Sequence, residues 1–142
     1  MWTFYGEPIE SHDDLHPDCT DFVYRITFSD GRMYIGKKAI RAIRKYPPLK
    51  GKVRCRRKLK NLPFLNYQGS ADEVKNLTPV KKEIIYQCSS RKSSTYLETW
   101  MLFKERAVLR DIYINANIGG SYFSNSLDGL LDTDDCLEHI RK

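Results

Sequence analysis

The chain has 142 residues, of which 41% are hydrophobic and 30% charged, and its formal net charge is +6. That length is typical of a single domain, which buries about two-thirds of its unfolded surface and needs no metal or disulfide to fold. The four cysteines form no Cys-x-x-Cys pair, which argues against a zinc site and predicts free thiols in a reducing, cytoplasmic compartment. The N-terminus lacks a leader pattern and no apolar run could cross a membrane, so we expect neither secretion nor membrane insertion.

Residues 1–20 are acidic and contain two prolines, which predicts an N-terminal tail or a strap packed on the domain. Within them, His12-Asp13-Asp14-Leu15-His16 superficially resembles a metal cluster. Nothing else in the sequence supports that interpretation, so we expect no metal there.

Residues 22–36 are predicted to form a β-hairpin, because two runs of β-branched and aromatic residues flank Ser29-Asp30-Gly31. A two-residue loop would pair positions whose numbers sum to 61, and a three-residue loop gives 60. Only the even sum puts Tyr24 and Tyr34 on one face. We favour it, although a β-bulge could change the parity. Both faces would then carry apolar side chains, so helices should cover parts of both.

Residues 37–60 contain twelve Lys and Arg and no acidic residue. Such an unmixed block repels itself unless a polyanion is nearby, so the segment is predicted to contact nucleic acid. Membrane-surface binding is less consistent with the sequence, because Pro47, Pro48 and Gly51 interrupt any amphipathic helix. The basic residues are Lys37, Lys38, Arg41, Arg44, Lys45, Lys50, Lys52, Arg54, Arg56, Arg57, Lys58 and Lys60.

The remaining elements follow in order. Ser70 and Glu73 form a capping-box pattern, which predicts a short helix ending before Pro79. A third strand is predicted over 82–88 and a helix over 95–110, where apolar residues recur at helical spacing. A turn over 115–120 follows. The acidic segment 121–142 is interpreted as a tail that forms a small helix or shields the basic block.

Glu98 and the two asparagines have structural explanations as well. If the helix begins at Thr95, the glutamate closes a capping box; if the helix begins near Ser89 or Ser90, that explanation fails. Asn115 and Asn117, taken singly, are typical turn residues after a helix.

Taken together, a tyrosine on the first strand, Tyr34-Ile35-Gly36 on the second, the basic region, a helix bearing Glu98 and the asparagines after it resemble the GIY-YIG nuclease family over residues 22–120. The run 34–38 and Tyr67-x-Gly69-Ser70 look like a phage-type, homing-endonuclease-like branch, which implies a phage protein acting in the host cytoplasm. The implied fold is α/β (α+β), a small three-stranded antiparallel sheet flanked by helices. One domain, 1–142, would then comprise the tail, the 22–120 core with a basic insertion at 37–66, and the acidic tail.

The resemblance further implies an endonuclease that cleaves DNA with one divalent ion, Mg²⁺ or Mn²⁺. The implied metal ligand is Glu98. The implied catalytic residues also include Tyr24 or Tyr34 to activate water, Arg44 with Arg41 as the alternative, and Asn115 in preference to Asn117. The implied substrate contacts are Gly36, Lys37, Lys38, Arg54, Arg56, Arg57, Lys58 and Asn117.

Three departures from the family pattern matter. The gap of seventeen residues from Glu98 to Asn115, or nineteen to Asn117, leaves the choice of asparagine open. Phe22 replaces the glycine that opens the first family triplet, and the prolines after Gly36 put the usual arginine-bearing helix in doubt. Two other functions therefore stay open: a non-catalytic nucleic-acid-binding module on the same scaffold, and an adaptor for an acidic protein. One metal in one site cuts one strand, so a double-strand break would require a homodimer or two encounters.

Overall fold

A computed structural model describes residues 1–53, 56–69, 71–123 and 127; the side chains of residues 44–46, 56 and 57 lie outside that description. No helix in these ranges is long and apolar enough to cross a membrane. In chain order the elements are β1 (Trp2–Phe4), β2 (Glu7–Ile9), η1 (His12–Asp14), β3 (Asp21–Phe28), β4 (Met33–Ala39), β5 (Arg41–Tyr46), β6 (Arg56–Asn61), α1 (Asp72–Lys75), β7 (Pro79–Cys88), α2 (Arg91–Lys104), η2 (Ala107–Leu109), β8 (Asn117–Ile118) and β9 (Tyr122–Phe123).

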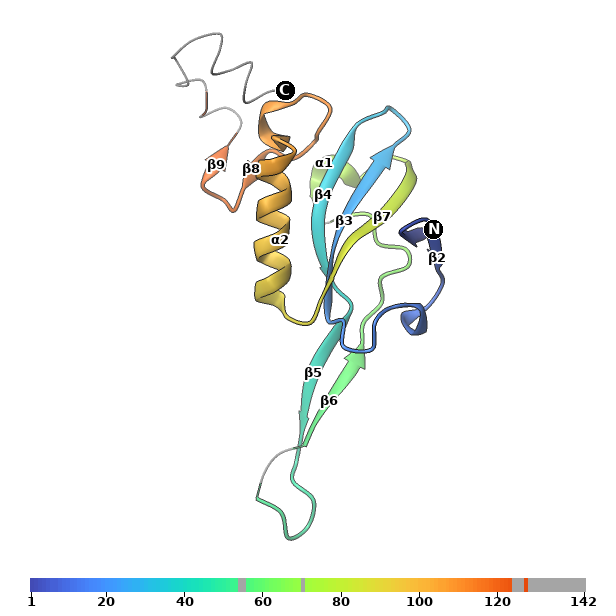
Figure 1. Ribbon diagram of the computed structural model, residues 1–142, viewed down its shortest axis with the longest axis vertical. Coiled ribbons are helices and arrows are strands. Elements are labelled where there is room, and N and C mark those ends of the chain that lie inside the picture. Colours follow the sequence, from blue (N-terminus) through green and yellow to red (C-terminus); the bar gives the residue numbers. More distant parts are fainter. Residues whose placement is uncertain (54–55, 70, 124–126, 128–142) are drawn as a thin grey trace.

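The central sheet has five strands in the order β2-β1-β7-β3-β4. The three predicted strands, β4, β3 and β7, pair antiparallel as expected. Two further strands come from the N-terminal segment that we predicted to be a tail or a strap packed on the domain, and β1 runs parallel to β7. This segment is held because Trp2 is fully buried and its Nε1 donates to the Phe64 carbonyl oxygen at 3.0 Å. The sheet is therefore mixed, and the fold is α+β (Figure 1).

The hairpin of β3 and β4 has the predicted register. Tyr24 pairs with Gly36 and Ile26 with Tyr34, so the paired numbers sum to 60. Gly31 occupies the left-handed region at φ +87° in the three-residue loop, where an L-residue would be strained. A bulge does occur in β3, but it lies on the side that pairs with β7. Tyr24 and Tyr34 therefore share one face of the sheet.

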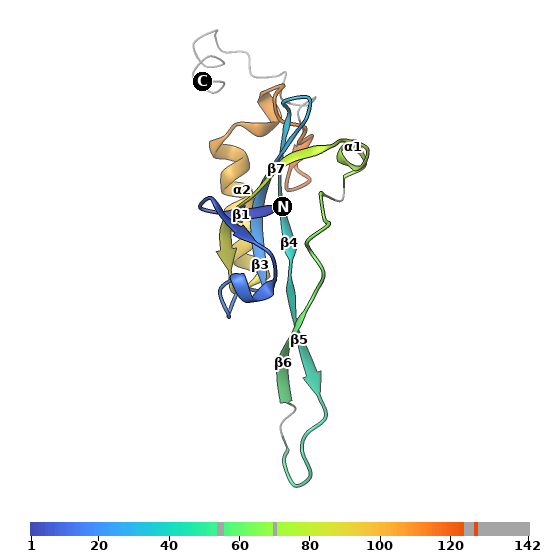
Figure 2. The same cartoon turned by 90° about the vertical axis from the view of Figure 1, so that its right-hand side faces the viewer.

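Different kinds of structure cover the two faces of the sheet. On one face α2 packs Met101 and Leu102 against Val23 and Ile35. On the other face the cover consists of N-terminal side chains, the loop carrying Phe64, and the one-turn helix α1 with its buried Val74. Figure 2 shows α1 and α2 on opposite sides of the sheet. The prediction that helices cover both faces holds fully for the α2 side and only in part for the other.

The helix boundaries differ from the predicted ones. In α2 the cap is Ser90, whose Oγ accepts from Ser93 N at 3.1 Å, so the helix begins four residues earlier than expected. It ends at Lys104, and Arg106 then adopts a left-handed conformation at φ 53°. The cap of α1 is Ala71, which makes no side-chain cap bond. The predicted capping residue, Ser70, lies outside the described residues, as do residues 128–142 of the acidic tail.

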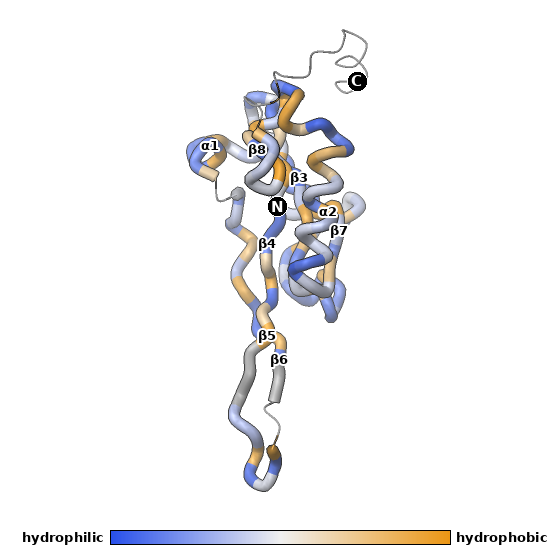
Figure 3. Tube along the Cα trace, turned by 90° about the vertical axis from the view of Figure 1, so that its left-hand side faces the viewer, coloured by the Kyte–Doolittle hydropathy of each residue, from blue (hydrophilic) through white to orange (hydrophobic). Residues whose placement is uncertain are grey.

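Where the structure describes the basic segment, it contains no helix. Instead β5 and β6 pair with each other in a separate two-stranded sheet, and the arm that they form extends away from the core (Figures 1 and 2). Pro47, Pro48 and Gly51 lie in the loop that joins the two strands. In Figure 3 hydrophobic residues are concentrated in the core strands and α2, and a few stand out along the arm.

Candidate functional site

A pocket of about 270 Å³ lies at the β4 edge of the sheet. Tyr34 and Ile35 reach it from β4, Glu98 from α2, and Glu73 from α1, while the segment after η2 closes the remaining side. The full lining is Tyr34, Ile35, Ala71, Glu73, Glu98, Leu102, Ile114, Asn115, Ala116, Asn117 and Gly119. Four predicted site residues, Tyr34, Glu98, Asn115 and Asn117, are thus brought together from elements far apart in the sequence.

Asn115 fastens one wall of this pocket to the sheet. Its Oδ1 accepts from the Ile35 amide at 3.0 Å, and its Nδ2 donates to the Ile35 carbonyl oxygen at 2.8 Å. The side chain therefore pairs with β4 as a further strand would, and it provides hydrogen-bond partners for the Ile35 N–H and C=O groups at the open edge of the sheet. Backbone bonds from Met33 to Ile112 and from Ile114 to Met33, both 2.8 Å, continue this pairing.

Asn117 holds the next turn of the same wall. Its Oδ1 accepts from Gly120 N at 3.0 Å. The side-chain oxygens of both asparagines thus accept hydrogen bonds from backbone amides. These contacts give both residues a structural role in the wall of the pocket.

Glu98 is not a helix cap. Because α2 begins at Ser90, the glutamate lies in the interior of the helix and its half-buried carboxyl group lines the pocket. Burial raises the pKa of this carboxyl group, and the nearby charge of Lys37 lowers it. The Lys37 ammonium also donates a hydrogen bond to Thr95 Oγ1, one turn before Glu98.

The two tyrosines have different surroundings. Their ring centroids lie 6.4 Å apart, but Tyr34 lines the pocket whereas Tyr24 is only 1% exposed beneath it. Burial, together with the hydrogen-bonded hydroxyl of Tyr67, raises the pKa of Tyr24 far above its usual value. The pKa of Tyr34 rises to about 12, first through burial and then through the charge of Glu98. Both phenols are therefore neutral at pH 7.

Gly36 makes room for this pair. A Cβ at this position would lie 2.6 Å from Tyr24 Cζ, closer still to its hydroxyl oxygen, and 3.1 Å from Tyr34 Cε1. Gly69, in the second glycine-containing motif, has φ +117°, and a Cβ there would lie 2.7 Å from Val74 Cγ2. The two motifs thus pack around the same tyrosines, and each glycine lies where a side chain would collide with its neighbours.

The structure does not bring Arg41 to the pocket. The residue is 9% exposed. Its guanidinium group donates to Asn61 Oδ1 and to carbonyl oxygens of the N-terminal segment, those of His12, His16, Pro17 and Cys19, at 2.7–3.3 Å. These contacts tie the start of the arm to the N-terminal segment. Arg41 is therefore a structural residue and does not belong to the candidate site.

Arg44 lies on β5, paired with Lys58. At 3.3 Å per residue the eight residues from Gly36 to Arg44 span about 26 Å, where a helix would span about 12 Å. Because β5 continues away from the core (Figure 1), this geometry moves the arginine away from the pocket. The side chains of Arg44, Arg56 and Arg57, and Arg54 as a whole, lie outside the described structure.

The described pocket lining contains no Lys or Arg. The nearest predicted basic contacts are Lys37 and Lys38 on β4, which alternate to opposite sides of the strand. Lys37 reaches α2, and Lys38 Nζ lies 4.8 Å from the centroid of the Tyr67 ring. Both lysines therefore flank the edge of the sheet that carries the pocket.

Glu73 is the residue of this pocket that sequence reasoning missed. We interpreted it as the capping partner of Ser70, whereas the structure places its exposed side chain in the pocket lining, opposite Glu98. Its charge contributes to the raised pKa of Tyr34. Glu73 lies 25 positions from Glu98 in the chain. Only the folding of α1 over the face of the sheet that carries the tyrosines brings the two glutamates to one pocket.

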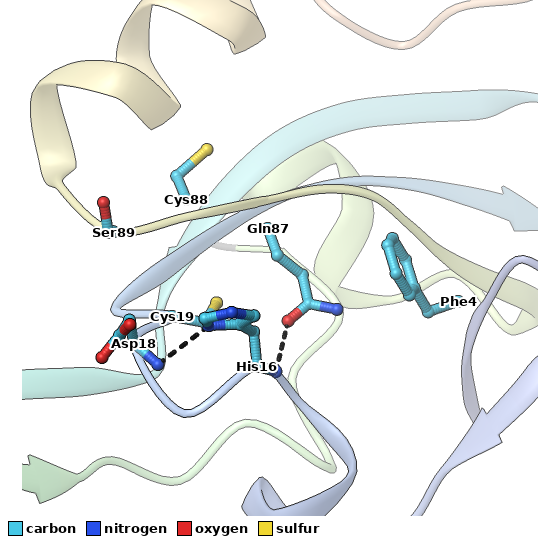
Figure 4. Close-up of a pocket in the computed structure, with 7 residues that line it drawn as sticks. All are labelled: Phe4, His16, Asp18, Cys19, Gln87, Cys88 and Ser89. Carbon is cyan, nitrogen blue, oxygen red and sulfur yellow. Dashed lines mark hydrogen bonds between the residues drawn. The ribbon is translucent and has the colours of Figure 1, made fainter.

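A larger pocket, of about 390 Å³, lies between the N-terminal segment and the end of β7 (Figure 4). Gln87 Oε1 there accepts from His16 N at 2.7 Å, and Asp18 N donates to His16 Nδ1 at 3.0 Å. Cys19 and Cys88 are free thiols whose pKa values are raised by burial. His16 and Gln87 are engaged in these hydrogen bonds and neither thiol is activated, so we do not assign chemistry to this pocket.

In the 12–16 run that superficially resembles a metal cluster, the His12 ring hydrogen-bonds backbone carbonyl oxygens. His12 Nε2 hydrogen-bonds the carbonyl oxygens of Leu62 and Ile40, at 2.8 and 3.1 Å. In the part of the chain that the structure describes, no three His, Cys, Asp or Glu side chains are grouped to hold a metal ion. Any metal in the Glu98 pocket would therefore need ligands from water or substrate.

Comparison with known proteins agrees with the resemblance seen in the motifs. Residues 2–118 match the family described as "Putative endonuclease segE, GIY-YIG domain". No curated protein and no solved structure matches the chain. The family match covers most of the chain, including both strands of the tyrosine hairpin, Glu98 and the asparagines. The chain therefore belongs to the GIY-YIG nuclease family.

Proposed function

We propose that this chain is a DNA endonuclease that hydrolyses phosphodiester bonds with a divalent metal ion held at Glu98. The observation that carries the proposal is the pocket itself: Tyr34 and Glu98 face one cavity, and the described lining offers carboxylates and no cation. Membership of a nuclease family supports the reaction class.

The donor groups of the pocket fit Mg²⁺ or Mn²⁺. Magnesium is typically held by one or two carboxylates and takes its other oxygens from water and substrate phosphate. Glu98, with Glu73 across the pocket, supplies that number of carboxylates. Burial raises the pKa of Glu98, and a nearby cation would reverse that shift. When bound, the ion would supply positive charge to the phosphate oxygens as the bond breaks.

Tyr34 is the tyrosine that we place against the substrate, since it lines the pocket and Tyr24 does not. Bringing its pKa from about 12 to 7 would require about 7 kcal/mol of differential stabilisation. A neutral hydroxyl that donates to a phosphate oxygen, or orients the attacking water, needs no such stabilisation. Tyr24 would then support the ring of Tyr34 from below, and Lys37 and Lys38 would contact the flanking phosphates.

The test is nicking of supercoiled plasmid DNA by wild type, Glu98→Gln and Glu105→Gln, with Mg²⁺ and with chelator. Glu105 is a matched control because it is a half-buried glutamate at the end of the same helix and does not line the pocket. We expect Glu98→Gln to lower the rate at least about 100-fold, since the metal contributes several kcal/mol. The control should cleave like wild type, and chelator should stop both.

Stability separates loss of chemistry from loss of fold. The raised folded pKa of Glu98 means that its contribution to stability is present below pH 4.5 and is lost as the pH rises. At pH 7 without metal, Glu98→Gln should therefore be at least as stable as wild type in urea. Near wild-type nicking by Glu98→Gln, or nicking in chelator, would refute the metal mechanism. Duplex binding without cleavage by wild type would instead support a binding module.

A further inference from the structure

The arm formed by β5, β6 and the described part of their connecting loop, residues 41–53 and 56–61, has little structural support of its own. Each of its strands pairs only with the other among the described strands, and isolated two-stranded hairpins are marginally stable in water. Its base is secured by Arg41 and by a 2.8 Å bond from Leu62 N to the Ile40 carbonyl oxygen. Beyond that base the arm extends from the core (Figure 2).

The charge pattern of the arm works against its own stability. Residues 41–61 contain ten Lys and Arg and no acidic residue. The register places Arg44 opposite Lys58 and Lys45 opposite Arg57. Like charges directly opposite each other destabilise a strand pair. An element that is marginal and also self-repelling is consistent with a ribbon shaped for a polyanionic partner.

The distribution of basic positions indicates the shape of that partner. Alternation along the strands puts positions 44, 56, 58 and 60 on one face and positions 45 and 57 on the other. A flat anionic surface, such as a membrane, would neutralise only one of these faces. A groove with phosphates along both walls neutralises both.

The width of the ribbon selects between the two grooves of duplex DNA. Paired strands lie about 4.8 Å apart before side chains are added. The minor groove is about 6 Å wide and the major groove about 12 Å, and the major groove admits a two-stranded ribbon. Exposed apolar side chains, Ile43 at 60% and its partner Leu59 at 43%, would there meet base edges and thymine methyl groups.

The position of the arm relative to the pocket sets a distance along the duplex. Arg44 follows Tyr34 by ten residues, almost all of them in β4 and β5, which at 3.3 Å per residue span about 33 Å. The two strands run on in the same direction in both views (Figures 1 and 2). One turn of DNA is about 34–36 Å long. The centre of the arm and the pocket are thus about one helical turn apart.

We propose that the β5–β6 arm enters the major groove of duplex DNA about one helical turn from the cleaved phosphate. The substrate is then double-stranded DNA, and the arm determines where the pocket cuts. The position of the cut rests on the proposed function, whereas the binding of the arm to the groove does not.

Binding is measured with Glu98→Gln as the background, so that no cleavage is needed. Lys50, Lys52 and Lys60, all exposed on the arm, are changed together to Gln. The matched control changes three exposed lysines of the core, Lys75, Lys81 and Lys92, and removes the same charge. The arm variant should flatten the slope of log affinity against log salt by about 2.7, because each phosphate contact contributes about 0.9. The control should keep the parental slope.

The groove is tested with duplexes that carry bulky substituents at C5 of pyrimidines, which project into the major groove. Placed at successive positions along the duplex, they should weaken binding by the parental chain at least tenfold within one segment, and a minor-groove ligand in that segment should not. Where wild type cleaves, the segment should lie about one turn from the mapped cut. The proposal is overturned if the minor-groove ligand competes and the C5 groups do not, or if arm and control variants bind alike. Preference for polyglutamate or anionic vesicles over duplex would also overturn it.

The two proposals fail separately. If wild type never cleaves but the arm-dependent, C5-sensitive binding is observed, the endonuclease proposal is wrong and the binding of the arm stands. If wild type cleaves and the arm variant, without Glu98→Gln, cuts the same positions at the same rate, the arm proposal alone is wrong.

Discussion

Replacing Gly36 with alanine tests whether the two tyrosines need the close approach that the structure gives them. Carbon atoms pack best at about 3.5–4.0 Å, and the new Cβ would lie 2.6 Å from Tyr24 Cζ, an overlap of about 1 Å. Tyr24 cannot move into solvent, because it is 1% exposed and its ring contacts the Trp2 ring edge-on, with 5.4 Å between the ring centroids. Overpacking of this kind typically costs about 1–3 kcal/mol, and we expect the upper part of that range.

The measurement has two parts. At about 4 °C per kcal/mol, Gly36→Ala should lower Tm by roughly 10 °C. Because Tyr34 Cε1 lies 3.1 Å from the same Cβ, its ring must shift as well, and small misplacements in a site can cost about 100-fold in rate. We expect nicking per folded molecule to fall at least tenfold at a temperature where the variant is still folded.

Gly31→Ala is the matched control. Gly31 has φ +87°, and an alanine Cβ at this position would meet nothing within 4 Å, so the change strains the backbone by about 1–2 kcal/mol without touching the tyrosines. It should lower Tm and leave nicking per folded molecule unchanged. If Gly36→Ala loses no more stability than Gly31→Ala and nicks like wild type, the argument that Gly36 exists to fit the tyrosine pair is refuted.

Three further outcomes are expected. Arg41→Ala should cost about 3 kcal/mol or more in urea unfolding, because it removes the five hydrogen bonds that the guanidinium group donates to Asn61 and the N-terminal segment. Exposed Arg32→Ala should cost under about 1 kcal/mol; equal losses would contradict the structural role of Arg41. Asn115→Asp should reduce nicking and speed hydrogen exchange at the Ile35 amide, since a carboxylate oxygen replaces the donor to the Ile35 carbonyl oxygen; unchanged exchange would count against the edge pairing. The Tyr34 pKa, raised to about 12, predicts that the free energy of unfolding falls as the pH rises from 10 towards 12. Tyr34→Phe should lose less stability over the same pH range. A phenol that titrates near pH 10 by absorbance would contradict this.

Local chemistry was sufficient to predict several elements. The alternation of apolar residues and the Ser29-Asp30-Gly31 loop predicted the register of β3 and β4, because strand periodicity and turn geometry act over a few residues. β7 and α2 were also predicted, although α2 begins at Ser90, where the serine cap is a weaker signal than the apolar spacing after it. The ordered set of Tyr24, Tyr34-Ile35-Gly36, the basic block, Glu98 and the asparagines after it predicted the family, which the family match confirms.

The strands β1 and β2 were not predictable in the same way. They are three residues each and are joined by Tyr5-Gly6, both with positive φ, a turn usually marked by Asn-Gly. Their stability comes from burying Trp2 against Phe22 and Tyr24 in β3 and from its hydrogen bond to Phe64, 62 positions away. Such a contact has no local signature.

The sequence by itself determined the register of the tyrosine hairpin and the unmixed charge of residues 37–60, since each depends on residues close together in the chain. It also determined the family, through the order of short motifs over residues 22–120. Only the tertiary structure decided the site. It brought Glu73 to the pocket with Glu98, gave Tyr34 the open position and Tyr24 the buried one, and assigned Arg41 to the N-terminal segment. It also turned the basic block into an extended ribbon, and the longer rise of a strand carries Arg44 away from the pocket. These outcomes depend on how separate elements pack, and local sequence does not encode that packing.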